Sequence, residues 1–231
     1  DAAVDYAACS AILMMHLSRF CEDMSLWASS EYGFIAISPR ASTGSSIMPQ
    51  KRNPDAAELI RGKAGRVFGD LQALLVMEKG LPYAYNRDLQ EDKSLFFDIE
   101  DTVQSSLEAF AVLVQNIEPN IAAMRAALDE GYIEATDVAE FLVIKGIPFR
   151  TAYQAAKRLV EHCIEEKKSL RSIAQADLSV HEAFDKAAID ARELAEYLDP
   201  VACVSRRSQI GGPAPERVPE QIERLQRFIA V

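Results

Sequence analysis

A serine-rich, positively charged loop is the segment of the sequence most able to do chemistry. Residues 44–55 read GSSIMPQKRNPD and combine two serine hydroxyls with the neighbouring cations Lys51 and Arg52. The triplet Asn53-Pro54-Asp55 predicts that a helix begins here, because asparagine caps helices, proline suits the first helical position and aspartate complements the helix dipole. Cations at this positive end of a helix are unfavourable unless an anion joins them. The loop therefore predicts either a binding site for a carboxylate or phosphate, or a solvated surface loop with an ordinary helix cap.

A second polar segment, residues 85–93, reads YNRDLQEDK. Tyr85, Gln90 and Lys93 carry donors that can hold a polar substrate. Gln90 and Lys93 are three residues apart and therefore share one face of a helical turn. Taken alone, the segment is better interpreted as the solvated start of a helix, because charged side chains are mostly exposed.

Long helices are expected to position both segments. Apolar residues recur every seven positions in three stretches, with further apolar residues between them: Tyr6, Leu13, Leu17, Phe20, Met24 and Trp27; Ile60, Ala64, Val67, Leu71 and Leu74; Phe96, Ile99, Val103, Phe110, Leu113 and Ile117. This spacing predicts amphipathic helices suited to bundle packing. At 1.5 Å per residue, each helix is about 35–40 Å long. A compact monomer does not bury such long apolar seams, so we expect several subunits to assemble into one bundle.

The pattern predicts an all-α chain with two domains. A central long-helix bundle domain is expected at residues 1–118, including the loop 42–54. A smaller helical C-terminal domain is expected at residues 119–231, where shorter helices are joined by turns at Gly131, Gly146 and Gly211. Strand signals are weak throughout. The helical pattern starts within a few residues of Asp1, which suggests a beginning inside a longer protein.

Composition narrows the classes of function. The 231 residues include 25 Lys and Arg against 35 Asp and Glu, a formal charge of -10 that disfavours nucleic acid and anionic membranes as partners. No apolar run is long enough for a membrane span. The four cysteines have no paired spacing, which favours reduced thiols in a cytoplasmic protein. Without a metal-ligand pattern or a glycine-rich nucleotide fingerprint, we expect no metal and no organic cofactor.

The loop GSSIMPQKRNPD resembles the signature loop, GSSxxPxKxNP, of the fumarase/aspartase superfamily, whose members eliminate fumarate from succinyl-containing substrates. Gln50, immediately before Lys51, and Asp55 resemble the argininosuccinate lyase branch. Three further stretches resemble the same branch, so that the likeness spans the whole chain: GLPYAYNRDLQEDK from Gly80, ATDVAEFLVIKGIPFR from Ala135, and the Gly211-Gly212 turn. Pro213 and Tyr153 depart from the family pattern, which usually has Thr and His there.

The resemblance implies a reversible β-elimination that splits argininosuccinate into arginine and fumarate, as a step of arginine biosynthesis. It implies that Ser45 is the base, that Lys51 activates it and stabilises the aci-carboxylate intermediate, and that Glu58 orients a catalytic histidine. The substrate contacts implied by the match are Ser46, Asn53, Tyr85, Gln90 and Lys93.

The family's catalytic histidine lies in a Thr-His pair, and this sequence has no such pair. His16, His162 and His181 lie outside any such motif, and we expect them to be structural or solvent-exposed. The resemblance also implies a homotetramer in which three subunits build each active site. We therefore expect the chain to be a fragment of about half the enzyme that is inactive alone. The alternatives are another fumarate-releasing enzyme such as adenylosuccinate lyase, a related cycloisomerase, a silent crystallin-like structural protein, or a helical assembly domain.

Overall fold

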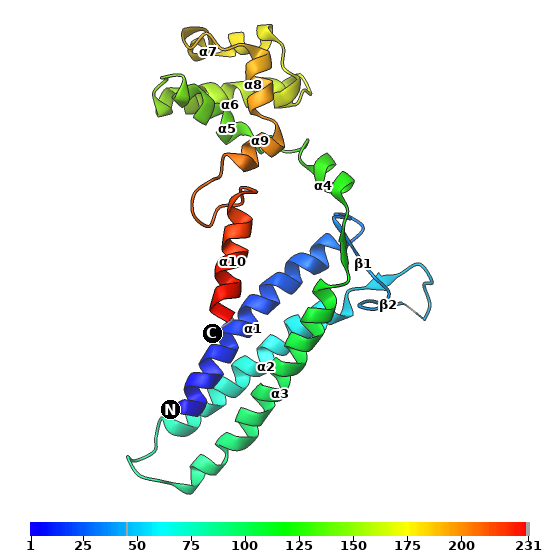
Figure 1. Cartoon of the computed structure of the whole chain (residues 1–231), viewed down its shortest axis with the longest axis vertical. Coiled ribbons are helices and arrows are strands. Elements are labelled where there is room, and N and C mark those ends of the chain that lie inside the picture. The colour runs from blue at the N-terminus through cyan, green and yellow to red at the C-terminus, as the bar shows by residue number, and fades with distance from the viewer. Residues whose placement is uncertain (45, 230–231) are drawn as a thin grey trace. The chain divides into compact units, whose positions relative to one another are not determined.

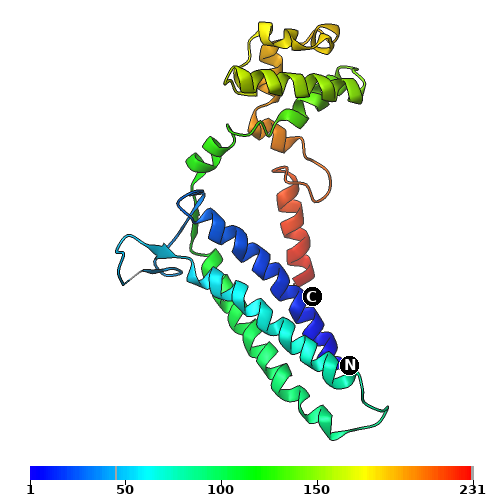
Figure 2. The same cartoon turned by 180° about the vertical axis from the view of Figure 1, so that it is seen from behind.

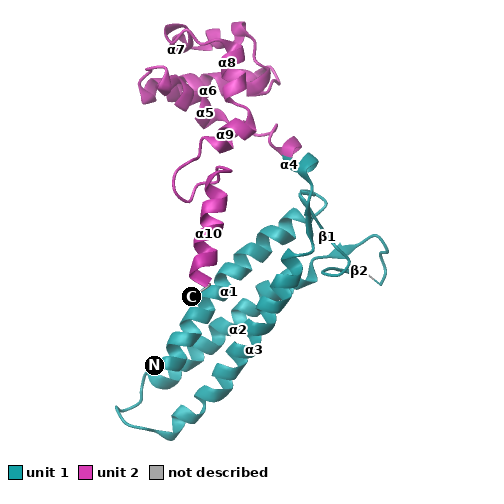
Figure 3. Ribbon diagram, viewed as in Figure 1, with its two compact units in different colours: residues 1–124 teal, residues 125–231 magenta. Residues whose placement is uncertain are grey.

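The computed structural model describes residues 1–44 and 46–229 and is built mainly of helices, which confirms the all-α prediction (Figure 1). The chain forms two compact units, residues 1–124 and 125–231 (Figure 3). The domain boundary expected after residue 118 stays a prediction, because a compact unit is not by itself shown to fold alone.

Unit 1 is organised around long helices that lie side by side, as both views show (Figures 1 and 2). They are α1 (Ala2–Trp27), α2 (Asp55–Glu78) and α3 (Asp92–Val114). Their common core buries Met14 and Leu17 of α1 against Ile60 and Val67 of α2 and Ile99 of α3. The expected long-helix bundle is therefore present, and α2 begins at the Asn53-Pro54-Asp55 triplet, where the sequence predicted a helix start.

Of the apolar residues predicted to form a seam along α1, the chain itself buries Leu17 and Met24 and leaves the other four partly exposed. Tyr6, Leu13, Phe20 and Trp27 remain between 36% and 49% exposed. The buried stripe runs through smaller residues on the adjoining face of the helix: Ala7, Ser10, Ala11, Met14, Leu17, Cys21 and Met24. Aromatic seam residues instead lie at the edge of the bundle, where the ring of Phe20 is 5.3 Å from that of Phe110 of α3.

Four short strands occur among the described residues, although strand signals are weak throughout the sequence. β1 (Ile35–Ile37) pairs antiparallel with β4 (Ile117–Pro119), and β2 (Thr43–Gly44) pairs antiparallel with β3 (Arg52–Asn53). The first pair joins the segment after α1 to the segment after α3. The hydroxyl of Ser38 strengthens that junction by donating to Asn116 Oδ1 at 2.7 Å.

Unit 2 packs shorter helices around an apolar core. These elements are α5 (Ala135–Ile144), α6 (Phe149–Glu165), η2 (Leu170–Ser172), η3 (Gln175–Val180), α7 (Glu182–Lys186), α8 (Ala191–Tyr197) and α9 (Pro200–Ser205). Leu142, Leu159, Phe184 and Leu194 are fully buried in this core. The division between the units falls within α4 (Ile121–Ala127). The last helix, α10 (Arg217–Ile229), lies wholly within the described residues and buries none of its side chains.

The glycine turns predicted for unit 2 are confirmed. Gly131, Gly146 and Gly211 have φ angles of +79°, +92° and +81°, which favour glycine. Gly212 is required for another reason, since a Cβ there would lie 2.2 Å from the carbonyl oxygen of Arg207.

Ion pairs and hydrogen bonds hold two buried carboxylates of unit 2 in place. The carboxylate of Asp177 accepts hydrogen bonds from Lys168 Nζ at 2.9 Å and from the amide of Ala174 at 2.7 Å, and contacts His162 Nε2 at 2.8 Å. These partners hold the pKa of Asp177 well below its usual range, with the His162 contact as the largest cause. Asp137 of α5 is likewise buried between the guanidinium groups of Arg206 and Arg207, each at 3.0 Å.

Candidate active site

The signature-loop residues lie on a β-hairpin that leads directly into α2. Thr43 pairs with Asn53 and Gly44 with Arg52, so the hairpin brings the two ends of the loop together. The Thr43 hydroxyl also donates to the carboxylate of Asp55, the first residue of α2. The loop is thus anchored at its base to the helix N-terminus, and its residues 46–51 are exposed to solvent (Figure 1).

The cations of this loop are exposed. Lys51 and Arg52 both have solvent-accessible side chains, and neither forms an ion pair within residues 1–44 and 46–229. The amide of Lys51 donates to the carbonyl of Met48 at 3.0 Å, which shapes the turn before β3. Two uncompensated cations close to a helix N-terminus form a favourable environment for an anion.

The other expected site residues of this region lie in the loop or in the first turn of α2, but the predicted helix cap is wrong. Ser46 is exposed, and Glu58 is exposed in the first turn of α2. Asn53 does not cap the helix as predicted: Pro54 occupies the N-cap position, and no side chain in the described part of the chain caps α2. The reason is that Asn53 belongs to β3 and is held in the hairpin opposite Thr43. Ser45, the expected base, lies outside the described residues.

The second group of expected site residues also forms a cluster. Tyr85 lies before η1 (Arg87–Gln90) and is 72% exposed, and its hydroxyl accepts a hydrogen bond from Gln90 Nε2 at 3.2 Å. Lys93, in the first turn of α3, lies 3.0 Å from the carboxylate of Asp92. Lys93 also lines a pocket of about 500 Å³ together with aromatic residues, including Tyr6 and Phe97.

The two groups lie at opposite ends of α2, as both views of the bundle show (Figures 1 and 2). The signature loop precedes the first residue of α2, and the cluster around Tyr85 follows its last residue. A helix of 24 residues is about 36 Å long. The structure therefore places Ser46, Lys51, Asn53 and Glu58 before or within the first turn of α2, and Tyr85, Gln90 and Lys93 beyond its other end. It does not join these two groups within one copy of the chain.

The histidines have the structural or exposed positions that the sequence predicted. His16 is exposed on α1, and His162 is bound to Asp177 in unit 2. His181 Nδ1 accepts from the amide of Ala183 and so caps α7. None of the three lies near the signature loop along the chain, and the roles that they have are local.

The described residues lack the patterns of a metal site and of a membrane-spanning helix. Across residues 1–44 and 46–229 there is no group of three or more His, Cys, Asp or Glu side chains that would hold a metal ion. Within the same ranges, no helix is long and apolar enough to cross a bilayer.

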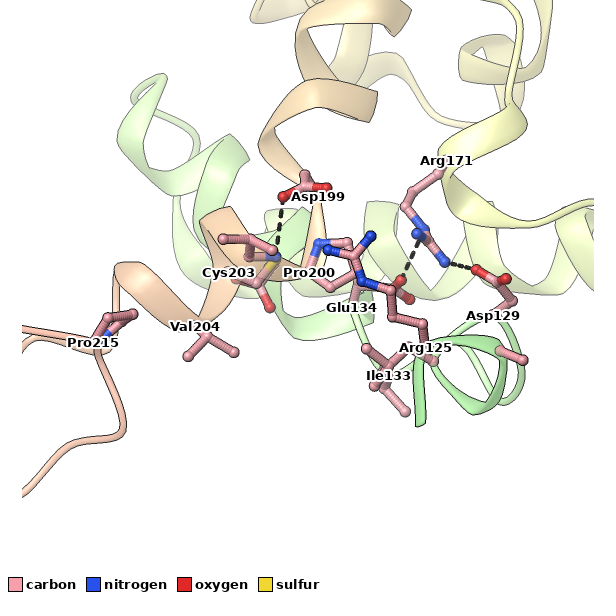
Figure 4. A pocket seen from close by; sticks show the side chains of 14 residues that line it. Arg125, Asp129, Ile133, Glu134, Arg171, Asp199, Pro200, Cys203, Val204 and Pro215 are labelled. Atoms are coloured by element: carbon pink, nitrogen blue, oxygen red, sulfur yellow. Dashed lines mark hydrogen bonds and ion pairs between the residues drawn. The ribbon is translucent and has the colours of Figure 1, made fainter. Parts of the chain in front are cut away.

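Sequence reasoning missed a pocket in unit 2. It has a volume of about 580 Å³, and Arg125, Glu134 and Arg171 contribute charged groups to its lining (Figure 4). These residues come from α4, from the residue before α5 and from η2, so only the fold brings them together. No spacing in the sequence would have indicated this site, because its cations are 46 positions apart (171 minus 125).

Two models of known protein families match this chain, one within unit 1 and one within unit 2. A family model described as "Lyase" matches residues 1–69, which include α1, the hairpin and the start of α2. A second model, described as "Argininosuccinate lyase C-terminal", matches residues 132–205, from the residues before α5 to the end of α9. Both matches agree with the sequence resemblance.

Curated relatives give the same result. The chain is 47% identical over 227 residues to a protein of Pelotomaculum thermopropionicum named argininosuccinate lyase, which covers 98% of this chain and 48% of the relative. It is 46% identical over 230 residues to the argininosuccinate lyase of Acetivibrio thermocellus, which covers 100% of this chain and 49% of the relative. The chain therefore spans about half the length of the curated relatives it matches.

Solved structures support the fold. A variant of EDDS lyase with bound fumarate matches with a TM-score of 0.82 and 27% identity, covering 99% of this chain and 46% of that structure. A class II fumarase from Schistosoma mansoni matches with a TM-score of 0.67 and 22% identity, covering 84% of this chain and 40% of that structure. The second likeness concerns the fold alone.

Proposed function

Because the chain belongs to the argininosuccinate lyase family, we propose that it supplies part of an enzyme that reversibly splits argininosuccinate into arginine and fumarate. The observation that carries this proposal is the GSSIMPQKRNPD loop, held by β2 and β3 at the start of α2 within the segment that matches the lyase model. The proposed setting is arginine biosynthesis in the cytoplasm, and no cofactor is required.

The proposed reaction begins with proton removal. The Ser45 oxygen takes a proton from the carbon next to a carboxylate of the succinyl part, and the electron pair left behind is delocalised into that carboxylate. A neutral hydroxyl is a weak base, so Ser45 must act as an alkoxide. The positive charge of Lys51 and the nearby N-terminus of α2 favour that anion.

Lys51 has a second proposed role in the next step. The aci-carboxylate intermediate carries two negative charges on one group, and an adjacent ammonium stabilises it in the manner of an oxyanion hole, where one donor contributes about 3–4 kcal/mol. The aci-carboxylate then returns to an ordinary carboxylate, and its electron pair forms the new carbon–carbon double bond of fumarate. At the same time the carbon–nitrogen bond breaks, and nitrogen leaves with the electrons of that bond as part of arginine. The leaving nitrogen takes its proton from a general acid. The family resemblance gives this role to a histidine of a Thr-His pair, and none of His16, His162 and His181 belongs to such a pair.

The remaining loop residues are proposed to hold the substrate and the acid. Ser46 and Asn53 are assigned to a substrate carboxylate, since both lie on the hairpin beside Lys51. Glu58 is assigned to orienting a catalytic histidine that this chain does not provide. Its exposure in the first turn of α2 leaves its carboxylate accessible to such a partner.

Tyr85, Gln90 and Lys93 are proposed to bind the amino-acid portion of the substrate. Because they lie at the far end of α2 from the signature loop, the two groups must come from different copies of the chain if they serve one site. A homotetramer with shared active sites meets this requirement, and the exposed seam of Tyr6, Phe20 and Trp27 offers apolar surface for such an assembly.

The chain alone is proposed to be inactive, because its own residues provide the base and substrate contacts but no general acid. The test is fumarate release from argininosuccinate, followed by ultraviolet absorbance, with this chain alone and with the full-length protein. Turnover at full length only would support the proposal. Turnover by the chain alone would overturn the assignment of the acid. No fumarate release by either the chain or the full-length protein would favour a sister lyase or a crystallin-like structural protein.

A further inference from the structure

The pocket of unit 2 combines apolar walls with charged groups, and it is separate from every residue assigned above. Ile133 is 57% exposed, Val201 54% and Val204 43%, and all three face this one hollow of about 580 Å³. Single exposed apolar residues are common, but several gathered in a concave site are typical of a place where a ligand buries them.

The carboxylates of the lining are already satisfied by protein groups. Asp129 forms an ion pair with the guanidinium of Arg171, and Glu134, which is almost fully buried, lies 3.2 Å from Arg171 Nε (Figure 4). Asp199 accepts from the amides of Val201 and Ala202, both at 3.0 Å, and so caps α9.

Asp137 completes this set, since it is held between Arg206 and Arg207. A cationic ligand would have to displace one of these partners from its carboxylate. Displacing a partner from a buried carboxylate leaves a charge uncompensated and is strongly unfavourable. The acidic residues of the pocket therefore do not favour a cation, although they outnumber the cations of the lining four to two.

Arg125 is the charged group of the lining whose hydrogen-bond donors are not used by the described residues. It lies in the last turn of α4, and Figure 4 shows its side chain extending toward the other lining residues. Its guanidinium makes no hydrogen bond or ion pair with any residue that the structure describes. A guanidinium presents planar donors that match a carboxylate, so an unpaired one beside apolar walls favours an amphipathic anion.

We propose that this pocket binds a small organic carboxylate with an apolar body, whose carboxylate pairs with Arg125 and whose body contacts Ile133, Val201 and Val204. The volume lies within the range of about 300–1,000 Å³ that is common for small-molecule sites. This site is independent of the proposed lyase chemistry, because all its lining residues belong to unit 2.

The experiment uses three probes of nearly equal shape with the full 231-residue chain. They are 3-phenylpropionate, the neutral 3-phenylpropanamide and the cationic 3-phenylpropylamine, titrated by calorimetry, with methyl NMR to locate the shifts at Ile133, Val201 and Val204. For ligands of this size we expect a Kd of about 1 mM for the carboxylate. The amide and the amine should bind about tenfold more weakly, because they lose the charge-assisted hydrogen bonds to Arg125.

Variants assign the binding to the pocket. Arg125→Gln should weaken 3-phenylpropionate to the level of the amide and leave the amide unchanged. Val204→Thr, which alters a wall with little change of shape, should weaken all three probes. Arg150→Gln is the matched control, since Arg150 is exposed on α6 of the same unit and does not line the pocket.

Three results would overturn the proposal. Tighter binding of the amine would show that the carboxylates dominate the site. Equal binding of carboxylate and amide, or carboxylate binding that survives Arg125→Gln, would remove Arg125 from the role. Absence of saturable binding by all three probes at 20-fold the expected Kd, about 20 mM, would show that the pocket takes no ligand of this class.

Discussion

The two units treat apolar and charged side chains differently. Both units bury aliphatic side chains, but among the described residues of unit 1 no aromatic side chain is buried, and Phe20 and Trp27, for example, stay partly exposed. Around α5 to α8, unit 2 instead fully buries large side chains, among them Phe184. The difference shows that the helices α5 to α8 enclose aromatic side chains, whereas the long helices of unit 1 leave theirs at the surface.

The charges show the same contrast. In unit 1 the cations of the signature loop are exposed and form no ion pair within the described residues. In unit 2 the buried carboxylates of Asp137 and Asp177 are each held by two or more partners. The loop with the proposed chemistry thus carries unpaired cations, whereas the buried carboxylates of unit 2 are paired and serve the structure.

The largest effect is expected from the proposed base. In the full-length protein, Ser45→Ala should lower kcat by about 10²–10⁴-fold and leave substrate binding largely intact, because the substitution removes proton abstraction. Steady-state kinetics and binding of the substrate to the variant check this. Ser30→Ala, at an exposed serine just beyond α1, serves as the control. Near-normal turnover by the Ser45 variant would remove that residue from the role.

A matched pair of leucine substitutions tests the difference in packing. Leu159 of α6 is fully buried and Leu75 of α2 is 46% exposed. Leu159→Ala should lower the free energy of unfolding of unit 2 by about 2–5 kcal/mol. Leu75→Ala should change that of unit 1 by less than about 1 kcal/mol at low protein concentration.

Urea unfolding can follow the units separately. Trp27 is the single tryptophan of the chain, so its fluorescence reports on unit 1, whereas circular dichroism reports on both units. A large loss in the Leu75 variant even at low concentration would show that unit 1 is already packed as tightly as unit 2.

Removal of a substrate contact at the far end of α2 should affect affinity more than chemistry. Lys93→Ala in the full-length protein should raise KM about 10–100-fold, the usual contribution of a hydrogen bond to a charged group, with kcat changed only a few-fold. Lys79→Ala is the control, because Lys79 is exposed at the C-terminal end of α2 and is not assigned to the substrate. An unchanged KM would exclude the proposed contact.

A smaller, pH-dependent effect is expected inside unit 1. Partial burial, together with the neighbouring Asp98 carboxylate, raises the pKa of Asp70 from 3.8 to about 6. Arg66 pairs with Asp98 instead, and this pairing lowers the pKa of Asp98, with a minor contribution from Lys63. Between about pH 3.8 and pH 6, the folded state therefore holds a proton on Asp70 that the unfolded state has released.

Because of this extra proton, the folded state is more stable at low pH than at high pH. The stabilisation linked to protonated Asp70 is complete below about pH 3.8 and is lost as the pH rises through about 6. Asp70→Asn should remove this decline and stabilise the chain at pH 8 by up to about 2 kcal/mol, a value reduced for solvent screening. Urea titrations between pH 4 and pH 8 measure it. An unaltered pH slope in the variant would contradict the assignment.

The sequence predicted the helices well where the apolar spacing was long and regular. The pattern of Ile60, Val67 and Leu74 predicted α2, and the structure buries all three. On α1 the same periodicity identified the apolar stripe, but it did not indicate which residues of the stripe the chain itself covers. Tyr6 and Phe20 belong to that stripe and remain partly exposed.

Other features depended on contacts between distant segments. The helix-cap prediction for Asn53 was wrong, because pairing with Thr43 ten positions earlier draws it into a strand. The pocket that contains Arg125 and Arg171 had no local signal at all, since each residue by itself looks like an ordinary surface arginine. The residues of the signature loop, by contrast, were identifiable because they form one continuous stretch.

The central claim is that the signature loop and the Tyr85–Lys93 cluster of one chain serve different active sites. The most direct test mixes two inactive full-length variants, Ser45→Ala and Lys93→Glu, after denaturation and joint refolding. We predict that the mixture regains up to about a quarter of normal activity, because random assembly re-creates sites in which both groups are intact. If each variant refolds and associates but the mixture stays as inactive as its components, the two groups act within one copy and the claim is wrong.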